Sequence, residues 1–188
     1  MGKRLSAGEL LRQARALYDA PGSPLAQAAP QAGRSLFASG GQWMRHALEH
    51  LRGEALPGTV YSLNGLGFLK YGLACLGMLA VLATAFSLGP PWVMVLAVPV
   101  AVLIFYALEA QMVFLFPLAL DGSLSPFRDA RRWTIRAGGT GAVMRVVLPI
   151  AAVMLFGGLV GRGFLRSWCL GCLAICLWYE ELCRVSVS

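Results

Sequence analysis

Two long apolar runs constrain this chain more than any other feature of its sequence. The first covers residues 65–89 and carries one charge, Lys70, near an end, and the second, 92–118, follows a Gly-Pro-Pro turn. A helix rises about 1.5 Å per residue, so each run is long enough to cross roughly 30 Å of hydrocarbon. Only 13% of the residues are charged, against roughly 25% in soluble domains. The runs therefore predict an all-α integral membrane protein.

Two shorter apolar runs follow and bring the expected number of membrane spans to about four. Aromatic residues stand at both ends of the last run, as in the aromatic belts at membrane interfaces. Each run is only just long enough to cross, so a shallow re-entrant pair is the alternative. The expected membrane domain covers residues 65–188, with spans at 66–88, 92–118, 142–160 and 165–182.

The first 64 residues carry charges at ordinary density and show two amphipathic helical patterns. Ser6 and Glu9 have the spacing of a capping box at the start of the first pattern, and the second covers residues 34–51. Between them, residues 21–33 contain three prolines and two glycines, which predicts a flexible or extended linker. Residues 1–64 are therefore expected to form a cytoplasmic segment whose helices lie on the membrane surface or dock on a partner.

The distribution of basic residues predicts the orientation of the chain. Seven lysines and arginines lie in the first 64 residues, the Gly-Pro-Pro turn contains no charge, and the next connection contains four arginines. Cytoplasmic segments carry the excess of such residues, so both termini are expected in the cytoplasm. The net charge of +7 then needs no nucleic-acid partner, because the basic residues flank apolar runs. Membrane lipids and other transmembrane subunits are the expected partners.

Residues 117–139, PLALDGSLSPFRDARRWTIRAGG, resemble poorly characterised bacterial polytopic domains. In these a span ends in a proline and an acidic turn, and an arginine-rich amphipathic helix follows, so the resemblance implies the same local topology here. A bacterial inner membrane or another energy-transducing membrane is the expected location. Contacts with lipids or partner subunits are expected at Trp43, Arg128, Arg131, Arg132, Trp133 and Arg136.

Ionisable residues inside the apolar runs need partners. Glu109 lies in the second run, Lys70 near the start of the first and Arg145 near the start of the third. A chain that crosses back and forth places all three at a similar depth. An unpaired charge near the bilayer centre costs at least ~2.5 kcal/mol, so we expect the three to form a cluster. The cluster could be a proton or ion relay, an anion site, an ion pair that locks helix packing, or side chains that snorkel to the headgroups.

The sequence HALEH at residues 46–50 resembles the inverted zinc-protease motif H-x-x-E-H. The resemblance implies two histidine ligands for zinc and a catalytic base at Glu49. A third protein ligand is also needed, and the nearest carboxylate, Glu54, is too close in sequence. The polar flank of an amphipathic helix is therefore the preferred interpretation, and no metal site is predicted.

Cys169 and Cys172 form a C-x-x-C pair that is similar to the pair in membrane thiol oxidoreductases of the vitamin K epoxide reductase type. Such a pair is redox active when a cation activates one thiolate, and Arg166 stands three residues before. That family also needs a second cysteine pair in a loop, which this sequence lacks. Cysteines that pack between helices are the preferred interpretation. Histidine is absent from the expected spans, so no haem or pigment cofactor is predicted.

The remaining signals favour a protein that packs against other helices. Gly157 and Gly161 form G-x-x-x-G, a spacing that lets helix backbones approach closely. The sequence contains no complete set of catalytic residues. It therefore predicts a non-catalytic accessory, assembly or scaffold subunit of a larger membrane complex. The alternatives are a small oligomeric transporter or channel that uses Glu109, and a membrane thiol oxidoreductase.

Overall fold

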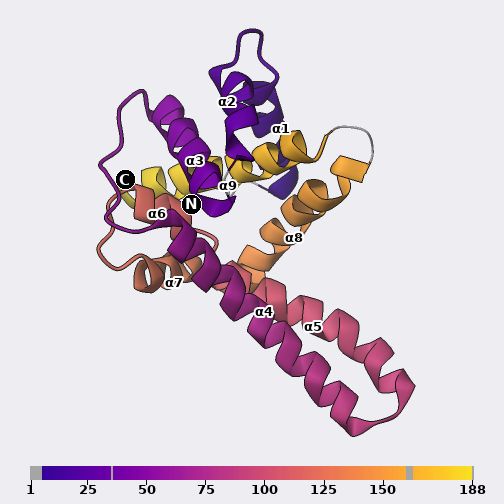
Figure 1. Ribbon diagram of the computed structural model, residues 1–188. Coiled ribbons are helices and arrows are strands. Elements are labelled where there is room, and N and C mark those ends of the chain that lie inside the picture. Colours follow the sequence, from indigo (N-terminus) through magenta and orange to yellow (C-terminus); the bar gives the residue numbers. More distant parts are fainter. Residues whose placement is uncertain (1–5, 35, 160–162, 188) are drawn as a thin grey trace.

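The computed structural model describes residues 6–34, 36–159 and 163–187, and the regular elements in these ranges are all helices. Figure 1 shows a long two-helix hairpin that projects from a body formed by the other helices. In chain order the helices are α1 (Ala7–Tyr18), α2 (Pro24–Ala32), α3 (Leu36–Arg52), α4 (Leu63–Leu88), α5 (Pro91–Gln111), α6 (Leu115–Leu120), α7 (Pro126–Arg136), α8 (Thr140–Phe156) and α9 (Phe164–Val187).

The hairpin consists of α4 and α5, which lie side by side along their length (Figure 1). Gly89 joins them with a φ of 96°, in the left-handed region that glycine adopts without strain. By length and composition, α4 and the stretch Pro91–Leu120 can each cross a membrane, and the number rises to three if the bent pair α7–α8 is one span. The structure thus supports two or three candidate spans and does not confirm four.

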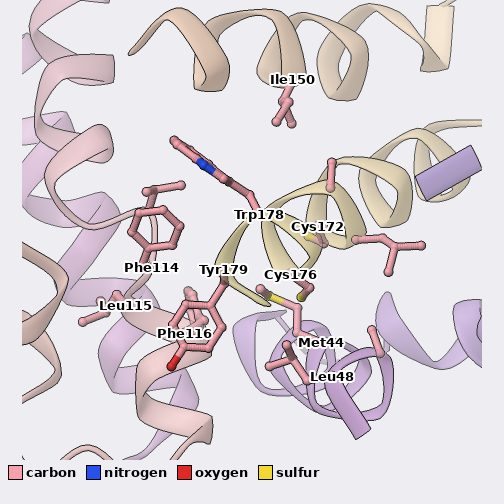
Figure 2. Packing of buried hydrophobic residues seen from close by; sticks show 14 of the residues in the cluster. Met44, Leu48, Phe114, Leu115, Phe116, Ile150, Cys172, Cys176, Trp178 and Tyr179 are labelled. Atoms are coloured by element: carbon pink, nitrogen blue, oxygen red, sulfur yellow. The ribbon is translucent and has the colours of Figure 1, made fainter. Parts of the chain in front are cut away.

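The predicted fourth span, 165–182, corresponds to α9, which is the central helix of the body. Helices α1, α2, α3 and α8 all contact α9. Its side chains Cys172, Cys176, Trp178 and Tyr179 are buried among side chains from α3, α8 and the start of α6 (Figure 2). Among the described residues, α9 is long enough to cross a membrane but is not apolar enough to count as a candidate span. Its apolar character is that of a core helix covered by protein.

The predicted third span, 142–160, corresponds to α8, which follows α7 after a bend of 97°. In Figure 1, α8 leads away from the base of the hairpin along the body and does not run beside α4 and α5. Val143, Val147 and Ile150 recur at helical spacing and are buried. Their side of α8 packs against α5 and α9, which contact this helix.

The N-terminal helices turn their apolar faces toward protein. The predicted cap of α1 is present, since Ser6 Oγ accepts a hydrogen bond from the Glu9 N–H at 3.3 Å. Leu10 and Ala14 of α1 are fully buried, and α1 packs against α8 and α9. The expected position on the membrane surface is therefore not observed for α1, because its apolar face covers the core of the body.

The proline-rich segment 21–33 contains a helix, α2, where the sequence predicted a linker. Pro24 stands in the first turn of α2, where backbone N–H groups make no intrahelical hydrogen bond, so its lack of an N–H costs nothing there. Pro30 does remove one backbone bond, but Leu25 and Ala29 are buried against α3 and α9. Burial of this face outweighs the helix-breaking tendency on which the linker prediction rested.

The predicted second span, 92–118, is broken after Gln111. A short turn at residues 112–114 leads into α6, whose six residues are all buried in the body. Thr134 Oγ1 of α7 donates a hydrogen bond to the carbonyl of Ala110 at 3.0 Å. Carbonyls in the last turn of a helix lack intrahelical partners, so this bond satisfies one of them and attaches α7 to the end of α5.

Leu173→Ala and Leu79→Ala test which apolar helix forms the core. Leu173 in α9 is fully buried, whereas Leu79 near the middle of α4 is 54% exposed. We expect Leu173→Ala to lower the free energy of unfolding by about 2–5 kcal/mol, because it leaves a cavity. Leu79→Ala should change it by roughly 0.5 kcal/mol or less. Near-UV circular dichroism during denaturant unfolding in detergent measures both, and equal losses would contradict the assignment of α9 as the core helix.

Candidate functional site at the base of the hairpin

Lys70 of α4 and Glu109 of α5 face each other where the hairpin enters the body. Lys70 Nζ lies 3.4 Å from Glu109 Oε1, and Lys70 is only 4% exposed. The ammonium group also lies 4.9 Å from the ring centroid of Tyr71 and 5.9 Å from that of Phe116. A carboxylate and two ring faces therefore surround a cation that would be costly to bury alone.

The pair marks both ends of a stretch without charged residues. Residues 71–108 contain no Asp, Glu, Lys or Arg. Each arm of the hairpin contains 18 of these uncharged residues, 71–88 in α4 and 91–108 in α5. Eighteen residues correspond to about 27 Å of helix in each arm. Lys70 and Glu109 thus stand at the point where the uncharged part of the hairpin meets the body.

A cavity of about 90 Å³ adjoins the ion pair. Its polar lining consists of Lys70, Glu109, Tyr71 and Cys172, and the remaining walls are mainly apolar side chains from α3, α6, α8 and α9. A single water needs roughly 10–15 Å³ of such volume, so several can fit beside the charged groups. The arrangement can hold water or a small polar molecule and can exchange protons between the lysine and the carboxylate.

Arg145 does not join this pair. It is exposed on α8, and within the described residues it forms no ion pair with Glu109. The reason is the helical period, since Val143 and Val147 face the core and Arg145 lies between them on the opposite side of α8. The structure thus brings together two of the three residues expected to cluster.

A second ionic site connects α3, the end of α6 and α9, and sequence reasoning missed it. Arg52 Nη2 donates to Asp121 Oδ2 at 2.9 Å, and Arg52 Nε donates to Glu180 Oε1 at 2.8 Å. The hydroxyl of Tyr179 donates to Asp121 Oδ2 at 2.6 Å. Burial alone would raise the pKa of Asp121, but the bonds from Arg52 and Tyr179 hold it below its ordinary value. The partners are 69 and 128 residues apart in sequence, so no local pattern could reveal the site.

The two tryptophans expected at partner contacts lie inward. Trp43 is 3% exposed, its Nε1 donates to the carbonyl of Leu25 at 3.2 Å, and its ring lies 6.4 Å from that of Trp168. It is therefore a core residue that holds α2 on α3, which corrects the prediction of a partner contact. Trp133 is half-buried and its ring lies 5.0 Å from that of Tyr179, so it too packs mainly on the body.

The four arginines of α7 face outward. Their side chains share the exposed side of this helix, while its buried side packs on the end of α5 and on α6. Arg132 lies 3.4 Å from Asp129, and the guanidinium carbon of Arg136 lies 5.4 Å from the ring of Trp133. The expected basic contact surface thus corresponds to Arg128, Arg131, Arg132 and Arg136.

The cysteine pair of α9 is placed for packing. Cys169 and Cys172 are buried, and burial raises the pKa of Cys169 to about 12 and that of Cys172 well above its ordinary value. A redox motif needs an accessible thiolate, which burial disfavours. Arg166, the cation expected to activate the pair, instead donates to Asp19 of the turn after α1 at 2.6 Å.

The zinc-protease resemblance finds no support in the arrangement of side chains. His46 and His50 are exposed, and Glu49 accepts hydrogen bonds from Arg45 and from the N–H of Leu56. Within the ranges that the structure describes, no group of three His, Cys, Asp or Glu residues is placed to hold a metal.

Gly157 lies at a close contact between the end of α8 and α9. A Cβ atom at Gly157 would come within 2.4 Å of Ser167 Oγ, so the missing side chain lets α8 approach α9. Gly161, the second glycine of the predicted G-x-x-x-G pair, lies outside the described residues. The glycine contact observed here is inside the protein.

A double-mutant cycle on Lys70 and Glu109 tests their pairing. Lys70→Met or Glu109→Gln alone leaves a buried group without its partner, and we expect each to lower the free energy of unfolding by about 3–5 kcal/mol. The double variant should recover a large part of this loss, because neither charge then remains. Denaturant unfolding in detergent measures all four proteins. Losses that simply add would show that the two side chains act independently.

Asp121→Asn tests the second ionic site through pH. The folded-state pKa of Asp121 lies below 3.8, so its stabilisation is present above about pH 4 and is lost as the pH falls through the folded-state value. We expect the variant to be less stable than the parent protein by about 2 kcal/mol or more at pH 7, with a difference that shrinks between pH 5 and pH 2. Asp19→Asn removes an exposed pair and should cost about 1 kcal/mol at most. A difference for Asp121→Asn that does not vary with pH would contradict this account.

Comparisons with known proteins were negative. No protein-family model, curated protein or solved structure matches this chain. Its function is therefore inferred from the burial, charge and contacts of its own residues.

Proposed function

We propose that this protein is a non-catalytic accessory or assembly subunit of a membrane protein complex, with the α4–α5 hairpin as its membrane anchor. One observation carries the proposal: the hairpin exposes large apolar side chains along both arms. They include Leu73, Leu76, Leu79 and Phe86 of α4 and Val95, Leu96, Val98 and Leu103 of α5. An apolar surface of this extent would not remain in water, so lipid or other apolar helices must cover it.

The dimensions of the hairpin support this anchor. Each arm contributes about 27 Å of uncharged helix, close to the roughly 30 Å thickness of a hydrocarbon core. Trp92 at the tip is 65% exposed, and tryptophan is enriched where a helix leaves hydrocarbon for the headgroups. The arms leave and re-enter the body at the same end (Figure 1). The body would therefore lie on one side of the membrane, and its basic residues favour the cytoplasmic side.

The surface between the arms favours helical partners. A groove of about 460 Å³ runs along the outer half of the hairpin, and its lining combines valines and leucines with the small side chains of Ala80, Thr84, Ala85 and Ala97. Small residues let the backbones of membrane helices approach closely, which strengthens van der Waals packing where no hydrophobic effect acts. A transmembrane helix of another subunit fits this description.

The body has the features of a support. Buried and partly buried charged side chains pair with one another: Lys70 with Glu109, and Arg52 with Asp121 and Glu180. Buried polar groups that satisfy each other in this way rigidify a core. Many of the large buried side chains gather around α9, between α8 and α3 (Figure 2). Such a body can hold the hairpin in a fixed position and present its outer surfaces to other subunits.

Flotation with phosphatidylcholine vesicles tests the anchor. The parent protein should float with the vesicles and resist extraction at alkaline pH. The double variant Leu79→Asp/Val100→Asp places charges at the middle of both arms, at a cost of about 2.5–3.5 kcal/mol each, and should float much less. Val60→Asp/Val185→Asp changes two exposed valines outside the hairpin and should float like the parent. Equal flotation of all three proteins would contradict the hairpin as the anchor.

Native mass spectrometry after extraction from native membranes in mild detergent tests the accessory role. Co-purifying membrane subunits in fixed stoichiometry are the expected result. A mass that corresponds to this chain alone, as a monomer or a pure homo-oligomer, would contradict the role.

The cavity beside Glu109 favours a second candidate, a small oligomeric transporter. Several copies of the hairpin would have to surround a water-filled path that reaches the ion pair. Glu109→Gln would then abolish ion flux across vesicle membranes while the oligomer still assembles. Flux that is unchanged in this variant would exclude Glu109 as the coupling group.

A further inference from the structure

The outward side of α7 combines cations with apolar side chains. Arg128, Arg131, Arg132 and Arg136 are exposed there, and only Asp129 of the same helix offsets their charge. Ile135, on the same side, is 65% exposed, and Leu124, just before the helix, is 79% exposed. Basic residues next to exposed apolar ones are typical of helices that lie in the headgroup region of a membrane.

The attachment of α7 sets its depth relative to the hairpin. The hydrogen bond from Thr134 to the carbonyl of Ala110 joins α7 to α5 one residue after Glu109. Glu109 ends the uncharged stretch, so α7 is fastened where the hairpin would leave hydrocarbon. The arginines of α7 therefore lie at the level of the lipid phosphates if the hairpin lies in a bilayer.

A hollow of about 430 Å³ opens at this place, between the end of α5, α7 and the start of α8. Arg131 contributes the cation to its lining. Gln111 and Thr140, which are hydrogen-bonded to each other, contribute an amide and a hydroxyl. Met112, Phe127 and Ile135 supply apolar walls. A cation, neutral polar groups and an apolar wall in one concave site match a phosphate group that carries hydrocarbon.

The geometry points to a binding site for the headgroup of an anionic phospholipid in this hollow. The inference rests on the proposed anchoring of the hairpin in a membrane. Arg131 binds the phosphate, for which a guanidinium is well suited, and the other three arginines draw anionic lipid toward the site. The first carbons of the acyl chains lie along Ile135 and Met112. An acidic partner protein would also satisfy the arginines, but it would not account for Ile135 and Leu124 exposed among them beside an apolar hairpin.

Lipid retention in native mass spectrometry tests the site. The full chain is reconstituted into nanodiscs of phosphatidylcholine and phosphatidylglycerol in equal amounts, and the lipids that stay bound after release are counted. We expect the parent protein to retain phosphatidylglycerol in preference to phosphatidylcholine. Arg131→Gln should lower that preference about fivefold, the effect of one cation near a headgroup. Arg128→Gln, on the same helix but outside the lining of the hollow, should lower it less, and Arg15→Gln on α1 should leave it unchanged.

The outcomes separate this inference from the proposed anchor. A parent protein that does not float with pure phosphatidylcholine vesicles would overturn the anchor. A parent protein that floats normally but shows no preference for phosphatidylglycerol would overturn the lipid site alone. Equal losses in Arg128→Gln and Arg131→Gln would also overturn the site, because they would indicate diffuse attraction to the surface. A second copy of the chain, retained in place of lipid and lost in Arg131→Gln, would identify the surface as a protein interface and overturn the proposal.

Discussion

A charge buried in a protein is costly without a partner, and this constraint organises the molecule around Lys70 and Glu109. Every residue between them in sequence is uncharged, so the chain has one continuous apolar hairpin that begins and ends at an ion pair. The pair is buried in the body, where aromatic rings and a small polar cavity surround it. Both arms are thus held at their base by the same contact. The position of α7 follows from it, because α7 is bonded to α5 one residue beyond Glu109.

The two ionic sites hold the chain in different ways. Lys70 and Glu109 lie 3.4 Å apart, at the long end of hydrogen-bonding distance, beside space for water. Arg52 binds Asp121 with two nitrogens and reaches Glu180 with a third contact, as the planar guanidinium allows. The first site therefore borders a cavity that can hold water. The second is a rigid link between α3, the end of α6 and α9.

The sequence predicted what depends on local pattern and apolar length, and missed what depends on distant contacts. The cap of α1, the hairpin turn and the outward arginines of α7 follow from short-range chemistry that Ser6, Gly89 and the helical period encode. The sequence predicted a span at α9 because core helices also carry long apolar runs, although α9 is not apolar enough over its length to count as a candidate span. The linker prediction at 21–33 and the contact prediction at Trp43 were wrong because both segments are buried by α9 and its neighbours. Arg145 faces away from Glu109 because Val143 and Val147 set the buried side of α8, and the sequence alone did not show which side of this helix would be buried.

A continuous set of contacts joins the hairpin to the body core. After Glu109 the chain turns at residues 112–114, and the ring of Phe114 lies 5.0 Å from that of Trp178 in α9. Helix α6 follows, with all its residues buried, and Asp121 directly after it accepts hydrogen bonds from Arg52 of α3 and Tyr179 of α9. A tilt of α5 would therefore have to displace α6 and strain a partly buried ionic site at the same time. Close packing resists such graded deformation, so these contacts favour one orientation of the hairpin relative to the body. A partner helix bound to the hairpin would then be positioned relative to the basic surface of α7, which suits a subunit that sets the arrangement of others.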